Sequence, residues 1–309
     1  MNNNNYDVVI IGGSYAGLSA ALALGRALFN VLIIDSGRPC NQQTPHSHNF
    51  LTQDGVEPAV IAEKALKQAL IYPGVNLLAD KVISVAGTDG RFDVMTEGGE
   101  AVHAKKLLFA TGIRDIMPDI PGLAECWGIS AIHCPYCHGY EYKGVATGLL
   151  ANGDEAADHA AFLSNWTDNL TVYTNGESVI SLDKQQMLAD LQVKIVETTV
   201  QRLKHDSGKL ESVILANGSE IPISALYVRL PFEQHTPVLE NIGCRLTKQG
   251  YIEVDETRQT SVAGIYAAGD NMSPMRSVSG AVASGTMAGV FISRQLITER
   301  NLSRTRPRV

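Results

Sequence analysis

The chain has 309 residues, 45% of them apolar and 18% charged, which is an ordinary composition for a globular protein of about two domains. The formal net charge is −7, and there is no basic run before a short arginine-bearing tail at 300–308, so the sequence predicts no nucleic-acid partner. No apolar run approaches the ~20 residues of a membrane span, and the first residues lack the regions of a signal peptide. We therefore expect a cytoplasmic protein that does not bind membranes.

The first elements along the chain predict a βαβ unit. Residues 6–11 (YDVVII) form a short apolar run typical of a buried strand, and residues 18–28 (LSAALALGRAL) predict a helix. Residues 31–35 (VLIID) predict the next strand. A unit of this kind opens many nucleotide-binding domains.

A glycine-rich turn, GGSYAG, connects the first of these strands to the helix. Gly12 and Gly17 fit the first and third glycines of the dinucleotide fingerprint, and Ser14 stands at the second. Backbone N–H groups at the helix start would hold a pyrophosphate, and Asp35, at the end of the second strand, would bind a ribose diol. A structural turn without a ligand is the alternative, but the strand, helix and acid together favour dinucleotide binding.

Residues 133–141 (HCPYCHGYE) place two cysteines, Cys134 and Cys137, two residues apart. A structural zinc site usually draws ligands from two separated segments, and there is no second CxxC. A structural disulfide is unusual in a cytoplasmic chain with only five cysteines. A redox-active dithiol is the favoured interpretation, because a CxxC at a helix start has a lowered thiol pKa and Pro135 suits the first helical turn.

A second strand, turn and helix are predicted at 146–163, followed by a strand at 169–174. The turn has Ala151 where a dinucleotide fingerprint has its first glycine. The stretch 144–183 has no Lys or Arg and six acids, so a 2′-phosphate would be repelled there. We therefore predict that NADPH is not the electron donor; a basic residue that reaches in from elsewhere in the fold is the alternative.

Further candidate pieces of the first nucleotide site come before and after this region. Residues 107–112 (LLFATG) and 264–270 (GIYAAGD) each predict a strand that ends in small residues, and 277–292 predicts a helix. Pro and Gly cluster at 117–122 and 230–237. These clusters mark the edges of a middle segment that is inserted into the first domain.

Together, IIGGSYAG, ATG at 110–112, the central CxxC and AAGD resemble the low-molecular-weight thioredoxin reductases over essentially the whole chain. The resemblance implies an α/β fold with two Rossmann-like nucleotide-binding domains, the NAD(P)-type domain being inserted into a discontinuous FAD domain. The FAD domain would comprise residues 1–116 and 237–309, and the inserted domain, which carries the CxxC, residues 117–236. Members of this family are usually homodimers.

The resemblance also implies FAD as cofactor and assigns residues to it. Asp270 would bind the ribityl chain, and the backbone N–H near Val278 would face the N1/O2 edge of the flavin. The ADP half would be held by Gly12, Ser14, Ala16, Gly17 and Asp35. Other residues near the cofactor would be Asn49, Val82, Thr111 and Gly112.

The segment CPYCHGYE is similar to a branch that includes the dithiol oxidases of gliotoxin and holomycin biosynthesis. That similarity implies that Cys137 faces the flavin while Cys134 exchanges with an external dithiol or disulfide. His138 would then move the proton of the exchange, with a solvent-facing helix residue as the alternative. Roles for His133 and Glu141 stay open.

The other cysteines, Cys40, Cys126 and Cys244, are expected to be packed thiols without a catalytic role. His48 lies just before Asn49, in a region that contacts the flavin in relatives, so a role on the flavin side stays open for it.

The sequence thus predicts an FAD-dependent dithiol–disulfide oxidoreductase without a metal site. Its electron partner would be O₂ or ferredoxin, and its substrate a small-molecule dithiol or a small redox protein such as thioredoxin. The alternatives are an NADPH-dependent thioredoxin reductase and a non-catalytic flavin redox sensor. The direction of the reaction depends on relative potentials.

Overall fold

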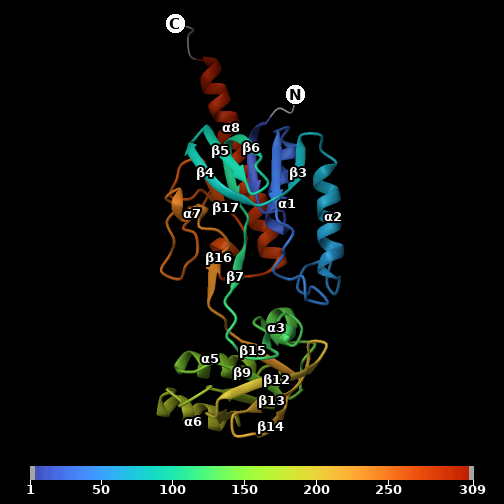
Figure 1. The fold of residues 1–309 in the computed structure, drawn as a ribbon, viewed down its shortest axis with the longest axis vertical. Helices are drawn as coiled ribbons and strands as arrows, with labels where there is room; N and C mark the ends of the chain where they lie inside the picture. Colours follow the sequence, from blue (N-terminus) through green and yellow to red (C-terminus); the bar gives the residue numbers. More distant parts are fainter. Residues whose placement is uncertain (1–3, 306–309) are drawn as a thin grey trace.

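A computed structural model of the chain describes residues 4–305. The start of the asparagine run and the end of the arginine-bearing tail lie outside the described residues. Figure 1 shows two sheet-containing units along the long axis of the molecule, with a narrow connection between them. The fold is α/β, as the sequence predicts.

The upper unit in Figure 1 is built on a seven-stranded sheet with the predicted βαβ unit at its centre. Four strands are parallel in the order β3-β2-β1-β6, and β17 pairs in parallel with the second half of β6, with Ile265 opposite Leu107. An antiparallel hairpin of β4 and β5 continues the sheet along the first half of β6. The strands are β1 (Asn5–Ile11), β2 (Val31–Asp35), β3 (Val75–Ala79), β4 (Val82–Thr88), β5 (Arg91–Thr96), β6 (Ala101–Phe109) and β17 (Ile265–Ala267).

Alternate residues of β1 point into the two cores of this unit, as expected for a strand covered on both sides. Val8 and Ile10 join the core with helices α1 (Tyr15–Arg26), α2 (Pro58–Leu70) and α8 (Val278–Thr305). Val9 and Ile11 face the opposite core, which includes residues of α7 (Val238–Asn241). A Cβ on Gly285 of α8 would lie 2.1 Å from the carbonyl oxygen of Ala16, so α8 approaches α1 closely only because a glycine stands there.

The lower unit has a five-stranded parallel sheet in the order β11-β10-β9-β15-β8. The predicted strand–turn–helix at 146–163 and the strand at 169–174 are confirmed as β9, α5 and β10. An antiparallel three-stranded sheet, β12-β13-β14, packs beside them; the sequence patterns did not predict it. The elements are β8 (Ala131–Ile132), β9 (Thr147–Leu150), α5 (Asp154–Leu163), β10 (Leu170–Tyr173), α6 (Leu182–Asp190), β11 (Lys194–Val196), β12 (Val200–Asp206), β13 (Lys209–Leu215), β14 (Glu220–Pro222) and β15 (Ala225–Val228).

The chain passes between the units twice, along a two-stranded antiparallel ribbon. It leaves the first sheet through β7 (Ile113–Asp115) and returns through β16 (Phe232–Gln234), with Asp115 opposite Phe232. The short helices are α3 (Leu123–Cys126), α4 (Pro135–His138) and the 3₁₀ turn η1 (Asp270–Met272). No helix within residues 4–305 is long and apolar enough to span a membrane.

Candidate active site

The start of α1 packs tightly against the end of β1 and leaves its backbone donors open. Gly12 has a φ of 105°, and a Cβ there would lie 2.3 Å from the carbonyl oxygen of Ala110. A Cβ on Gly17 would lie 1.9 Å from the carbonyl oxygen of Gly12. Ser14 is the N-cap residue but makes no capping hydrogen bond, and the first turn carries no acid. The helix start can therefore accept an anionic group.

Asp35 lies beside this turn, at the end of β2. Its two carboxylate oxygens accept hydrogen bonds from the N–H groups of Gly13 (3.0 Å) and Gly37 (3.2 Å). These bonds fix the carboxylate next to the glycine turn, where it could hold a ribose. Ala16 of α1 is buried, and its main chain packs against Gly285 of α8, so its evident role is to bring the two helices together.

The opposite side of the candidate nucleotide site is formed by the ends of β6 and β17. Asn271 donates from Nδ2 to the carbonyl oxygen of Phe109 (2.9 Å), while its buried Oδ1 has no hydrogen-bond partner within residues 4–305. Thr111 lies next to this amide, at 3.4 Å. Gly112 has a φ of 64° and open space where a side chain would project. An orphaned buried acceptor beside an open glycine indicates a site that a polar ligand completes.

Asp270 and Arg276 form a charged group near the start of α8. Arg276 donates to both oxygens of Asp115 (2.8 and 2.9 Å), and its Nε lies 3.8 Å from Asp270. Burial raises the pKa of Asp270 to about 6, although the Arg276 charge opposes this. Ser277 caps α8 by accepting from the N–H of Gly280 (3.0 Å). Asp270 thus lies a few residues before the start of α8, in the same charged segment as Arg276.

Two of the predicted cofactor residues, Val82 and Asn49, make contacts within the protein and not in the glycine turn. Val82 is the first residue of β4 and its side chain is buried in the core, so only its main chain could meet a cofactor. Asn49 and Asp54 both lie in the loop after β2. Asn49 has a φ of 59° and donates its N–H to Asp54 (2.7 Å).

Cys134 and Cys137 are joined by a disulfide, with their Cα atoms 5.3 Å apart. Cys134 is the N-cap residue of α4, and its Sγ accepts a hydrogen bond from the Cys137 N–H (3.2 Å). Pro135 occupies the first helical turn, as predicted. Both cysteines are partly exposed, so an external thiol could reach the bond.

The histidines on either side of the disulfide have different surroundings. Burial and the nearby Arg276 charge lower the pKa of His133 to about 4, and its Nε2 has no hydrogen-bond partner among the described residues. Burial also lowers the pKa of His138, while the Glu141 carboxylate raises it and the His48 charge lowers it. Both histidines are therefore mostly neutral near pH 7, and His138 is the one whose pKa a nearby carboxylate, Glu141, raises against the effect of burial.

The prediction that the lone cysteines are packed is confirmed for Cys126 and Cys244, which are buried. It is wrong for Cys40, which lies exposed in the loop after β2, where no apolar core covers it. The groups packed around the thiol partly desolvate it. This desolvation and the Asp270 charge raise the pKa of Cys40 to about 11. Cys40 is therefore a protonated thiol at neutral pH and a poor nucleophile.

The second glycine turn, at the start of α5, is covered by the chain itself. Asn152 donates to the carbonyl oxygen of Glu177 (2.9 Å) and accepts from the Val179 N–H (3.0 Å). Asp154 accepts from both the N–H (2.8 Å) and the hydroxyl (3.0 Å) of Ser181. The segment 177–181 is thus fastened beside the helix start that would hold a pyrophosphate.

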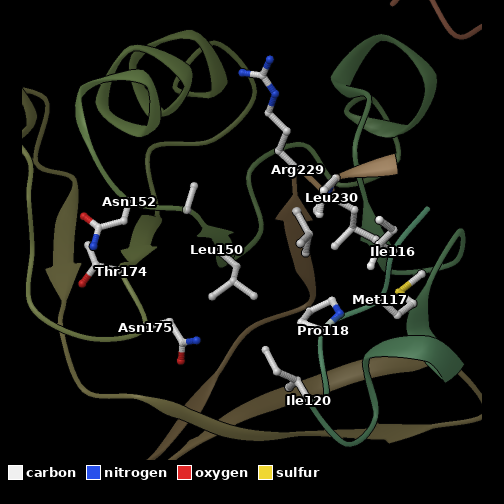
Figure 2. Close-up of a pocket in the computed structure, with 13 residues that line it drawn as sticks. Ile116, Met117, Pro118, Ile120, Leu150, Asn152, Thr174, Asn175, Arg229 and Leu230 are labelled. Carbon is white, nitrogen blue, oxygen red and sulfur yellow. The ribbon is translucent and has the colours of Figure 1, made fainter. Parts of the chain in front are cut away.

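A mostly apolar cavity of about 310 Å³ lies at the carboxyl ends of β9, β10 and β15 (Figure 2). Its apolar lining includes Leu150 and Met117, and Arg229 is its only charged lining residue. Arg229 is a basic residue from outside 144–183 that reaches this acidic stretch, which is the alternative that the sequence had left open. It is paired with Glu155 of α5 (3.0 Å), and Lys184 is likewise paired with Asp158.

Within residues 4–305, no group of three or more His, Cys, Asp or Glu side chains is arranged to hold a metal ion. The first site, in contrast, suits a flavin dinucleotide. It combines an uncapped helix start, a fixed carboxylate, an open glycine and an orphaned buried amide oxygen. These are donors and acceptors that a pyrophosphate and hydroxyl-bearing chain require.

A dinucleotide-binding sheet, a second parallel sheet and a CxxC disulfide together define a disulfide oxidoreductase. The family described as pyridine nucleotide-disulphide oxidoreductase matches residues 6–285. The chain belongs to this family and is an FAD-binding enzyme of the thioredoxin reductase-like type.

Individual relatives agree with this assignment. Thioredoxin reductase tcpT of Claviceps purpurea is 33% identical over 316 residues, which cover 97% of both proteins. The crystal structure of HlmI shares 34% identity with a TM-score of 0.92, covering 98% of this chain and 96% of that one. An oxidoreductase from Agrobacterium tumefaciens shares 37% identity with a TM-score of 0.89, covering 95% and 99%. The predicted resemblance is therefore confirmed.

Proposed function

We propose that this enzyme exchanges electrons between an external dithiol or disulfide and FAD through Cys134 and Cys137, without a nicotinamide cofactor. The observation that carries the proposal is the covered turn at the start of α5. There, Asn152 donates to the carbonyl oxygen of Glu177, and the N–H groups of Val179 and Ser181 donate to Asn152 and Asp154. Two acids in the first turn of α5, Asp154 and Glu155, add negative charge where a pyrophosphate would lie.

The two glycine turns of the molecule differ in the features that bind phosphate. The α1 turn has no acid in its first helical turn and no capping side chain, whereas the α5 turn has two acids and a segment fastened beside it. A pyrophosphate at α5 would have to displace that segment and overcome like-charge repulsion. The contrast supports one dinucleotide site for each chain, at α1.

The partly exposed disulfide permits the following exchange. One thiolate of an external dithiol attacks Sγ of Cys134 and breaks its bond to Cys137, which leaves as a thiolate. The second sulfur of the substrate then displaces Cys134. The substrate leaves as a disulfide, and both protein cysteines are reduced. His138 takes up the proton that the attacking thiol loses. When bound, FAD would supply the two-electron acceptor that restores the protein disulfide, with O₂, which becomes hydrogen peroxide, as the final acceptor. In the reverse direction, a reduced ferredoxin-type protein would supply the electrons with which the same cysteines reduce an external disulfide.

An anaerobic titration of the holoenzyme, followed by the visible absorbance of the flavin, tests this proposal. Dithiothreitol should bleach the flavin, and NADPH at the same concentration should not. Rapid bleaching by NADPH would instead assign the enzyme as an NADPH-dependent thioredoxin reductase. Slow bleaching by every reductant, with a redox-dependent change in binding to another protein, would point to a flavin redox sensor.

We also propose that the enzyme is a cytoplasmic homodimer that acts on a small-molecule dithiol or a small redox protein such as thioredoxin. The family resemblance supports the dimer, as do the exposed apolar side chains Met287, Val290 and Ile297 along α8. Light scattering should give twice the chain mass of 33.2 kDa. A mass of one chain at micromolar concentration would contradict the dimer.

A further inference from the structure

Glu141, at the end of HCPYCHGYE, contacts a histidine from the other unit of the molecule. Its Oε1 lies 3.5 Å from Nε2 of His48, which belongs to the loop after β2. The second ring nitrogen of His48, Nδ1, lies 3.6 Å from Asp54. The imidazole of His48 therefore lies between two carboxylates, one from each side of the junction between the units.

The loop that presents His48 is braced by its own hydrogen bonds. The N–H of Ser47 donates to the carbonyl oxygen of Val56 (2.8 Å), and the N–H of Gly55 donates to Ser47 (2.9 Å). Asp54 is fixed by the N–H of Asn49 at 2.7 Å. A braced loop holds the imidazole in place, so the contact with Glu141 depends on the position of the segment that carries the disulfide.

A neutral imidazole has one N–H and can donate to only one of these carboxylates, whereas an imidazolium can donate to both. Each ring nitrogen of His48 thus has a carboxylate oxygen within ion-pair distance. Burial lowers the pKa of His138, the Glu141 carboxylate raises it, and the neighbouring His48 lowers it.

We propose that His48 and Glu141 are positioning residues that form an ion pair across the junction and set the protonation of His138 during dithiol exchange. This inference rests on the proposed function, in which His138 takes up the thiol proton. Glu141 opposes the effect of burial and keeps His138 basic enough to accept the proton, and His48 limits how far Glu141 raises that pKa.

The other titratable groups near His138 contribute no charge of their own at neutral pH or are already paired. His133 is neutral, because its pKa is about 4, and the Arg276 and Asp115 charges beside it are paired with each other. The phenols of Tyr142 and Tyr227, which lie near Glu141, have raised pKa values and stay protonated. Glu141 and His48 are thus the charged groups that remain to act on His138.

The test uses two variants with opposite expected signs. In holoenzyme labelled at histidine, an NMR titration of the His138 ring should give a lower pKa in Glu141→Gln and a higher pKa in His48→Gln than in the parent. His138→Gln identifies the resonance. His46→Gln and Glu125→Gln are matched controls from the same loop and the same unit, and they should leave the His138 titration unchanged.

A kinetic measurement adds a readout of function. Rates of flavin bleaching by dithiothreitol are measured anaerobically across pH. The rate of each variant is divided by the rate of the parent at the same pH, so that the ionisation of dithiothreitol itself cancels. Normalised to its alkaline plateau, this ratio should rise toward low pH for Glu141→Gln and fall for His48→Gln. Two variants that shift the titration in the same direction, or not at all, would overturn the inference. Failure of dithiothreitol to bleach the parent would count against the proposed function alone, since the NMR titration needs no turnover.

Discussion

Arg276 compensates two nearly buried carboxylates, so its replacement gives the sharpest test of the candidate flavin site. The guanidinium makes two hydrogen bonds to Asp115, and these side chains are only 16% and 8% exposed. A hydrogen bond to a charged group contributes about 1.5–3 kcal/mol, and removing one partner of a buried ion pair costs about 3–5 kcal/mol. Because Asp270 also loses its nearest cation, we expect Arg276→Gln to lower the free energy of unfolding by about 4 kcal/mol.

The variant should also retain less FAD, because loss of the Arg276 charge raises the pKa of Asp270 further. Urea unfolding followed by tryptophan fluorescence measures the first effect, and flavin absorbance after dialysis measures the second. Arg276→Lys keeps the charge but loses the two-pronged geometry, so it should lie between parent and Gln variant. The exposed ion pair of Arg245 with Glu253 provides the control, since Arg245→Gln should cost less than about 1 kcal/mol. The reasoning fails if Arg276→Gln is as mild as that control.

Three further predictions concern catalysis, cofactor binding and stability. Cys134→Ser and Cys137→Ser should each bind FAD, but the rate of flavin reduction by dithiothreitol, measured by stopped flow, should fall at least about 100-fold. A normal rate in either variant would contradict the exchange. Gly17→Ala should be purified colourless and be destabilised by about 1–3 kcal/mol, because its Cβ would lie 1.9 Å from a carbonyl oxygen; a yellow protein of normal stability would show that the turn can relax. Because burial raises the folded-state pKa of Asp270 to about 6, folding takes up protons there. Its contribution to apoprotein stability should therefore fall by roughly 2 kcal/mol as pH rises from 4 to 6. Asp270→Asn should remove that part of the pH dependence in urea unfolding, and an unchanged slope would refute the assignment.

The sequence predicted those parts of the site that follow from local patterns. The turn with Gly12 and Gly17, the acid at Asp35 and the helix-start position of the CxxC depend on residues close together in the chain. Periodicity and glycine spacing report such features directly, because one strand, turn and helix create them.

Contacts between distant segments could not be predicted in this way. Arg276 and Asp115 are 161 residues apart, and the contact of His48 with Glu141 joins segments attached to different sheets. The charge count at 144–183 missed Arg229 for the same reason, since that residue reaches the cavity from the end of β15. Which charges meet across the fold is decided by topology, and no local pattern encodes it.

The two-stranded ribbon of β7 and β16 has a consequence for how the protein is made. Everything from β8 to β15 emerges from the ribosome as one continuous stretch, so the lower sheet can form while synthesis continues. The upper sheet has to wait for β17 and α8, the last elements, before β6 gains its final parallel partner and α1 is covered. Until then, the apolar face of the nascent β1–β6 sheet lacks its α8 cover. We therefore expect chains truncated before β17 to aggregate through this half and to depend on chaperones, while the central segment is already resistant to protease.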